Sequence, residues 1–95
     1  MPLIHASHIL LPSRKIAARL YPRLVAQELS FTEAVTRYSI CVSKSHEGDL
    51  GFMAPGLLER DFERGLWNAP VACPSEPFQS SLGWHIVWVH QKVWP

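Results

Sequence analysis

The chain has 95 residues, 47% of them apolar, which is enough for one hydrophobic core but not for a second domain. We therefore expect a single domain spanning residues 1–95. The formal net charge is +1, and the 9 basic and 8 acidic residues are mixed along the chain, which argues against a general binder of nucleic acids or membrane surfaces.

The first predicted element is a β-strand over residues 3–11, a mixture of apolar and small polar residues that stops at Pro12. Side chains of a strand return to the same face every second residue. One face of this strand therefore carries Ile4, Ala6, His8 and Leu10.

An amphipathic helix is predicted over residues 14–28, with Ser13 as its N-cap. Pro22 lies in its middle, where it lacks a backbone donor and crowds the carbonyl group of Ala18. We therefore expect a kink or a break between two short helices. The apolar stripe of this segment comprises Ile16, Ala17, Leu20, Leu24 and Val25.

A second helix is predicted to start at Ser30 and to end near Ser39. Ser30 and Glu33 have the spacing of a capping box, in which each side chain accepts a hydrogen bond from the other residue's backbone N–H group. A polar loop is expected over residues 41–48. The apolar stripe of the helix comprises Phe31, Ala34, Val35 and Tyr38.

A short strand is predicted over residues 48–53, because an apolar stretch there is bracketed by Gly48 and Gly51. One more helix is predicted over residues 57–67, weakened by Gly65. Its apolar positions are Leu58, Phe62 and Leu66.

The clearest strand covers residues 83–90, which are rich in β-branched and aromatic side chains, as in a central strand buried on both faces. Before it, prolines punctuate an extended region around Val71 and Ala72. The order of elements is strand, helices, short strand, helix, strand, strand. This order, with short connections, predicts an α+β fold in which helices pack around an antiparallel sheet.

The amino terminus has no basic stretch ahead of an apolar run, and no segment approaches the ~18 apolar residues of a membrane span. We expect a soluble, unprocessed, cytoplasmic and monomeric protein. Cys41 and Cys73 could form one bridge, but a cytoplasmic setting favours free thiols. The sequence leaves both states open.

Two histidines lie inside predicted strands, each on a face shared with aliphatic neighbours. His8 belongs to the first strand and His85 to the last. If those strands are adjacent, the two imidazoles can meet, and opposite tautomers can satisfy each other's ring nitrogens. Taken singly, each histidine is better explained as a hydrogen-bonded structural residue than as a catalytic one.

Cys41 follows the second helix at a position that can line a groove or fill the core as a small apolar residue. Together with His8 and His85 it allows a third interpretation, a thiol nucleophile paired with histidine. No cysteine or histidine pair has the spacing of a zinc site, so we expect no metal. Four apolar residues have the composition of either an open pocket or a core: Leu50, Met53, Leu58 and Phe62.

Five landmarks in chain order resemble the parvulin family of prolyl isomerases over nearly the whole chain. The most specific are the Gly48-Asp49-Leu50-Gly51-Phe52 and Gly83-Trp84-His85-Ile86 segments, accompanied by Ser7-His8-Ile9-Leu10, Tyr38-Ser39-Ile40-Cys41 and Phe62. The resemblance implies the FKBP-like fold of that family, a four-stranded antiparallel sheet surrounded by about four helices.

The resemblance also implies an activity and a set of site residues. It implies rotation about X-Pro bonds in proline-containing peptides and flexible protein segments, without metal or organic cofactor. Pro12 stands where phosphate-directed members place basic residues, so a preference for phosphorylated clients is not expected. A peptide-binding chaperone or docking module of the same fold is the alternative. The implied catalytic residues are His8, Cys41, Ser80 and His85, and the implied proline pocket comprises Leu50, Met53, Leu58, Phe62 and Leu82.

Overall fold

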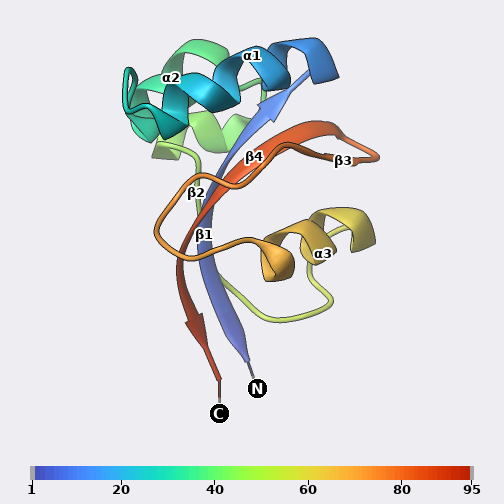
Figure 1. The fold of residues 1–95 in the computed structure, drawn as a ribbon. Helices are drawn as coiled ribbons and strands as arrows, with labels where there is room; N and C mark the ends of the chain where they lie inside the picture. The colour runs from blue at the N-terminus through green and yellow to red at the C-terminus, as the bar shows by residue number, and fades with distance from the viewer. Residues whose placement is uncertain (1, 95) are drawn as a thin grey trace.

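A four-stranded antiparallel sheet forms the centre of the protein in the computed structural model, which describes residues 2–94 (Figure 1). Its strands lie in the order β2-β1-β4-β3, so the first and last strands of the chain are neighbours. His8 pairs with Val87, and Leu10 with His85. The strands are β1 (Leu3–Leu11), β2 (Asp49–Met53), β3 (Phe78–Ser80) and β4 (Gly83–Val93).

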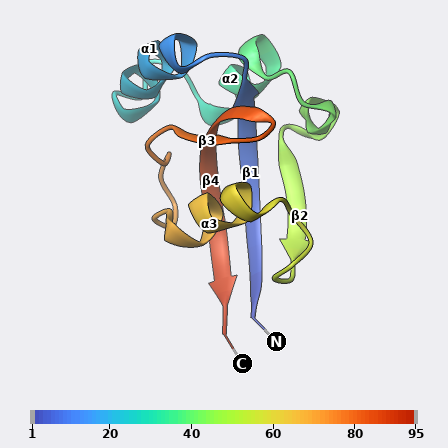
Figure 2. The ribbon, with the colours of Figure 1, turned by 90° about the vertical axis from the view of Figure 1, so that its right-hand side faces the viewer.

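Helices cover both faces of this sheet. Helices α1 (Arg14–Val25) and α2 (Phe31–Tyr38) lie on one face, and α3 (Arg60–Asn68) lies on the other (Figures 1 and 2). A 3-10 helix, η1 (Val42–His46), precedes β2. This architecture confirms the predicted α+β class and antiparallel sheet. None of the helices in residues 2–94 has the length and apolarity needed to cross a membrane.

The two faces of the central strands build two separate cores, as the two-residue period predicts. The core under α1 and α2 includes Ile9, Leu11 and Ile86 from the strands. The core under α3 includes Ile4, Ala6, Val87 and Val89 from the same strands, together with Phe62 and Leu66 of the helix. Strand β4 is therefore buried on both faces from His85 to Val87, as its composition predicts, whereas Trp88 is half-buried and His90 is exposed.

Local signals in the sequence place several element boundaries correctly. Strand β1 has the predicted bounds, and Ser13 caps α1 by accepting the N–H of Ile16 at 3.3 Å. Ser30 and Glu33 form the predicted capping box of α2. These boundaries are predictable because each depends on contacts between residues close in sequence.

The predicted break at Pro22 is wrong, because α1 continues without interruption from Arg14 to Val25. Pro22 and Ala18 are both exposed, so the Ala18 carbonyl that Pro22 leaves without an intrahelical donor lies on the solvent side. The helix also ends three residues earlier than predicted. Gln27 has a left-handed φ of 59°, and the N–H groups of Gln27 and Glu28 bond back to the last turn as in a Schellman motif.

Three other element predictions need correction. The extended region expected around Val71 and Ala72 forms only isolated bridges to β4, at Val71 and Pro74, and the second strand that pairs with β4 besides β1 is β3, which was not predicted. Prolines at positions 70, 74 and 77 remove ladder donors from that stretch. Helix α3 starts at Arg60 because Glu59 is its N-cap, so Leu58 precedes the helix. The polar loop over residues 41–48 contains η1.

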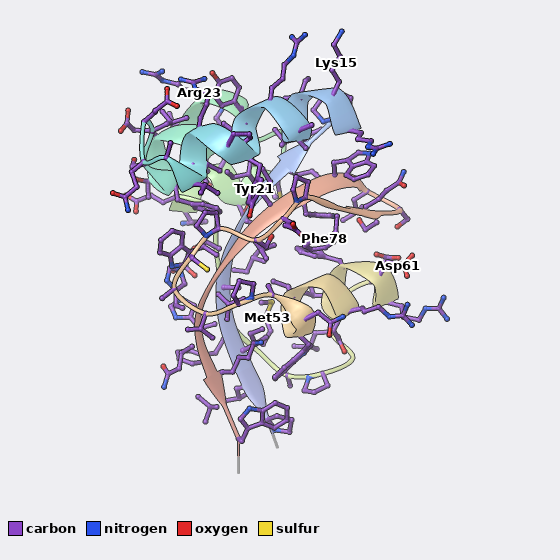
Figure 3. All side chains as sticks on the ribbon, in the orientation of Figure 1. Lys15, Tyr21, Arg23, Met53, Asp61 and Phe78 are labelled. Atoms are coloured by element: carbon purple, nitrogen blue, oxygen red, sulfur yellow. The ribbon has the colours of Figure 1, made fainter. Side chains whose placement is uncertain are left out.

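Gly65 allows β3 to pack tightly on α3. A Cβ atom at this position would overlap the ring of Phe78, which points from β3 toward α3 (Figure 3). Phe78 in turn lies 5.3 Å from the His85 ring, measured between centroids. Gly65, which lowers the helix propensity of this segment, is therefore required by the close packing of Phe78 against α3.

We predict that Gly65→Ala lowers the free energy of unfolding by about 1–3 kcal/mol, because the added methyl group overpacks the Phe78 contact. At a helix position with free space the same substitution would raise stability by about 1 kcal/mol. Urea denaturation measures the change, with the exposed Arg64→Ala in the same helix as the control. An unchanged or higher stability of Gly65→Ala would show that Phe78 has room to move.

Candidate active site

The pairing of β1 with β4 brings the two strand histidines into contact inside the α3 face of the sheet. The Nδ1 atoms of His8 and His85 lie 3.3 Å apart, and the rings are stacked with centroids 5.5 Å apart. The side chains are 1% and 0% exposed. One ring donates its Nδ1–H to the other, so the two imidazoles are in opposite tautomers.

Two serines complete a buried hydrogen-bonded chain across the histidine pair. The Oγ atom of Ser43 lies 3.1 Å from His8 Nε2, and the Oγ atom of Ser80 lies 2.6 Å from His85 Nε2. Ser80 also accepts the N–H of Leu82 at 3.1 Å. All four ring nitrogens therefore have partners while both rings are neutral.

Burial keeps both histidines uncharged at neutral pH. It lowers the pKa of His8 to about 4, with a smaller contribution from the neighbouring His85. Burial alone lowers the pKa of His85 to about 4. The interior of the site is thus polar and hydrogen-bonded, without a formal charge on either ring.

Aromatic rings enclose the histidine pair from the α3 side. Phe62 stacks on His85 with centroids 4.1 Å apart and lies 5.1 Å from the His8 ring. Phe62 is 3% exposed, so of the two interpretations, open pocket or core, its side chain matches the core. The stacking of its ring on two imidazoles, with Phe78 behind it, is the physical reason.

The remaining predicted pocket residues surround this aromatic stack. Leu50, Met53 and Leu58 pack in the same core, with Met53 buried and the two leucines half-buried. Leu82 is 58% exposed in the turn after β3. Exposed apolar surface is therefore present at Leu50 and Leu58, which pack on the cluster that contains Phe62, and at Leu82, whose N–H bonds to the serine partner of His85.

Cys41, which the resemblance implies to be a catalytic residue, has no hydrogen bond to either site histidine among residues 2–94. It is half-buried and occupies the N-cap position of η1, and no hydrogen bond of its thiol is present in residues 2–94. Ser43, two residues further on, contacts His8 instead and was missed. No local sequence pattern marks Ser43, because its contact with His8 depends on the path of η1, where the Gly48 N–H bonds to the Ser43 carbonyl.

Neither cysteine is bonded to the other in the structure; Cys41 and Cys73 are both free thiols. Within the described part of the chain, no group of three or more histidine, cysteine, aspartate or glutamate side chains has a geometry that could hold a metal ion.

Residues 9–91 match the rotamase family described as the PPIC-type PPIase domain. The chain belongs to this parvulin family of peptidyl-prolyl isomerases. The match extends from β1 to β4 and includes His85, and His8 lies one residue before its start. The predicted resemblance is therefore confirmed.

Individual relatives agree with the family. The chain is 36% identical to the foldase protein PrsA of Halalkalibacterium halodurans over 90 residues, which are 94% of this chain and 27% of the foldase. The crystal structure of the peptidylprolyl isomerase PrsA from Bacillus anthracis superposes with a TM-score of 0.89 at 31% identity, covering 97% of this chain and 42% of that one. The parvulin chain thus spans only about a quarter to a third of the first curated relatives it matches.

A small parvulin has the same fold over almost its entire length. The solution structure of NmPin, the parvulin of Nitrosopumilus maritimus, superposes with a TM-score of 0.81 at 28% identity. The superposition covers 96% of this chain and 98% of that chain. The four-stranded antiparallel sheet with its helices is therefore the parvulin fold.

Proposed function

We propose that this parvulin domain catalyses cis/trans isomerisation of X-Pro bonds in peptide segments of client proteins. The observation that carries the proposal is the buried, neutral histidine pair stacked under Phe62 and flanked by open leucine side chains. Rotation about the peptide bond has a barrier of ~18–20 kcal/mol because the twisted state loses amide resonance. Catalysis requires only that the site bind the twisted amide more tightly than either planar isomer.

In this proposal the prolyl ring docks on the apolar surface at Leu50 and Leu58, with the Phe62 ring beneath it. Removing water from the amide there favours the twisted state, which is less polar than the planar one. His8 and His85, fixed by their serine partners, act as positioning residues that hold the Phe62 ring and set the local polarity.

The proposal is tested by measuring exchange between the cis and trans NMR signals of short Xaa-Pro peptides with catalytic amounts of protein. We expect accelerated exchange for at least one Xaa residue. Titration shifts of the peptide signals without faster exchange would instead support the second candidate, a peptide-binding chaperone. That candidate is favoured by the relative named as a foldase, of which this chain covers about a quarter.

We predict that Cys41→Ser retains isomerase activity within about twofold of the unmodified chain. The Cys41 thiol has no hydrogen bond to either histidine, so neither thiol attack nor a proton relay through it is needed. The matched comparison is Ser43→Ala, which leaves His8 Nε2 without its partner and is expected to have the larger effect. Loss of nearly all activity in Cys41→Ser would restore the thiol-nucleophile interpretation.

The cytoplasmic location and the monomeric state stay predictions from the sequence. The proposed clients are unfolded or flexible segments. Phosphorylated clients are not expected, because the connection between β1 and α1 is short and consists of Pro12 and Ser13.

A further inference from the structure

The face of the sheet opposite the histidine pair is only half covered by helices. Helices α1 and α2 pack over Ile9, Leu11 and Ile86 at one end of the central strands. Beyond this cover, the same face carries a polar and aromatic patch made of His5, Ser7, Asp49, Trp88 and His90.

This uncovered patch is the floor of a groove of about 990 Å³. Its walls come from the end of α1, the segment joining α1 to α2, the end of η1 and residues 72–74. Tyr21 points from α1 toward the sheet on one side of the groove (Figure 3). Phe31 and Trp88 meet edge to face within it, with centroids 5.9 Å apart. Three large aromatic side chains therefore line a single open hollow.

The polar residues of the groove are preorganised by bonds among themselves. His5 Nε2 donates to Asp49 Oδ1 at 2.9 Å, and Ser7 Oγ lies 2.8 Å from His90 Nε2. The two histidine rings are 4.6 Å apart between centroids. These contacts hold the floor rigid without placing a helix or strand over it.

The charge of the groove is one-sided. Four of the chain's eight carboxylates line it, and none of its nine lysine and arginine residues does. Glu28 and Glu47 are exposed, and the ion pairs among residues 2–94 leave both free, whereas Asp49 pairs with His5 and Glu33 approaches Arg37 at 4.0 Å. The rim of an apolar and aromatic groove therefore carries uncompensated negative charge in a chain of net charge +1.

We propose that this groove, on the face opposite the proposed isomerase site, binds an extended client segment that carries lysine or arginine next to apolar residues. The long aliphatic stems of lysine and arginine cover apolar surface while their charged ends reach carboxylates. A cation over the Trp88 ring adds an attraction that an acidic or neutral segment lacks. Charge complementarity excludes acidic peptides and nucleic acid as occupants, because the rim repels them.

A second binding site on the reverse face would have a consequence for client handling. A client held at the groove has its X-Pro bonds confined near the domain, which raises their effective concentration at the other face. In this proposal the groove also binds unfolded basic segments that contain no proline, which the proposed isomerase pocket does not.

The test is an NMR titration of the complete chain with a proline-free, end-blocked peptide of about eight alternating lysine and leucine residues, ~26 Å long when extended. Its length is comparable with the 25 Å intermediate dimension of the domain. We expect shifts of the Trp88 indole signal and of the Ser7 and Leu29 amides, with the His85 amide unmoved. A glutamate-leucine peptide of equal length is expected to cause no such shifts.

Two charge variants make the test specific. Glu28→Gln with Glu47→Gln removes the free rim charges and is expected to weaken lysine-peptide binding by about twofold to thirtyfold, the range that two exposed charge pairs supply. The control, Asp61→Asn with Glu76→Gln, removes the same charge outside the groove and is expected to leave binding unchanged.

Equal weakening by both pairs, shifts confined to the α3 face, or equal binding of the acidic peptide would overturn the groove assignment. Concentration-dependent sedimentation of the peptide-free chain, abolished by the Glu28 and Glu47 changes, would assign the groove to a second copy and would also overturn the proposal. Cis/trans exchange of an Xaa-Pro peptide, measured with the same variants, separates the two sites. If neither the unmodified chain nor any variant accelerates the exchange, the proposed isomerase activity is contradicted, but the result for the groove is unaffected.

Discussion

Replacing Phe62 by alanine is expected to lower the free energy of unfolding by about 3–5 kcal/mol. The ring is 3% exposed and stacks on His85 at 4.1 Å and His8 at 5.1 Å between centroids. Alanine would leave a cavity beside two buried imidazoles and remove their apolar cover. Because a domain of this size is stable by only ~5–15 kcal/mol, the loss is a large share of the total.

Chemical denaturation of both forms measures this loss directly. The matched control is Phe52→Ala: Phe52 also packs on a histidine ring, His5, at 4.8 Å, but is 54% exposed, and its removal is expected to cost less than about 1 kcal/mol. The more conservative Phe62→Leu keeps most of the volume, so its isomerase activity can be measured on a folded chain and is expected to fall about tenfold or more. Equal stability of the two alanine variants would show that Phe62 is not part of the core.

Acidification from pH 6.5 toward 4 is expected to destabilise the domain by several kcal/mol. Burial lowers the pKa of His8 and of His85 from 6.5 to about 4, so the unfolded chain binds more protons than the folded chain between these values. The stabilising contribution is therefore complete above pH 6.5 and is lost as the pH falls through this range. At ~1.4 kcal/mol for each pH unit, the loss is at most about 3 kcal/mol for each histidine.

Unfolding free energies measured at several pH values test this expectation. His8→Gln retains a side chain that can bond Ser43 but does not titrate, so its stability is expected to fall less steeply with acid. Burial also lowers the pKa of His90, which adds to the trend in every variant, so the difference between the His8 variant and the unmodified chain is the informative quantity. Parallel curves for these two proteins would contradict neutral burial of the pair.

The groove and the proposed isomerase site use opposite faces of the same two strands, β1 and β4. Along β4, His85 and Val87 face α3, while Ile86 and Trp88 face the other side. A one-residue slip of register would exchange the two sets of side chains between faces. The register that pairs Leu10 with His85 therefore fixes both sites together.

The sequence by itself determined the features that depend on near neighbours and on the two-residue period of a strand. The caps at Ser13 and Ser30, the bounds of β1 and the faces that carry His8 and His85 were all predictable, because they involve residues within a few positions of one another. The segments that resemble the parvulin family led us to expect that the strands carrying the two histidines are neighbours in the sheet. Composition alone does not predict this.

Only the tertiary structure decided which side chains meet across long separations. The contact between His8 and His85 joins residues 77 positions apart, and the contact between His8 and Ser43 joins residues 35 apart. Such contacts depend on the register of β1 with β4 and on the path of η1, which no local pattern encodes. For the same reason the sequence did not predict that Phe62 is buried or that Ser43 is the hydrogen-bond partner of His8. The acidic groove on the reverse face likewise exists only in the assembled sheet, because its residues come from distant parts of the chain.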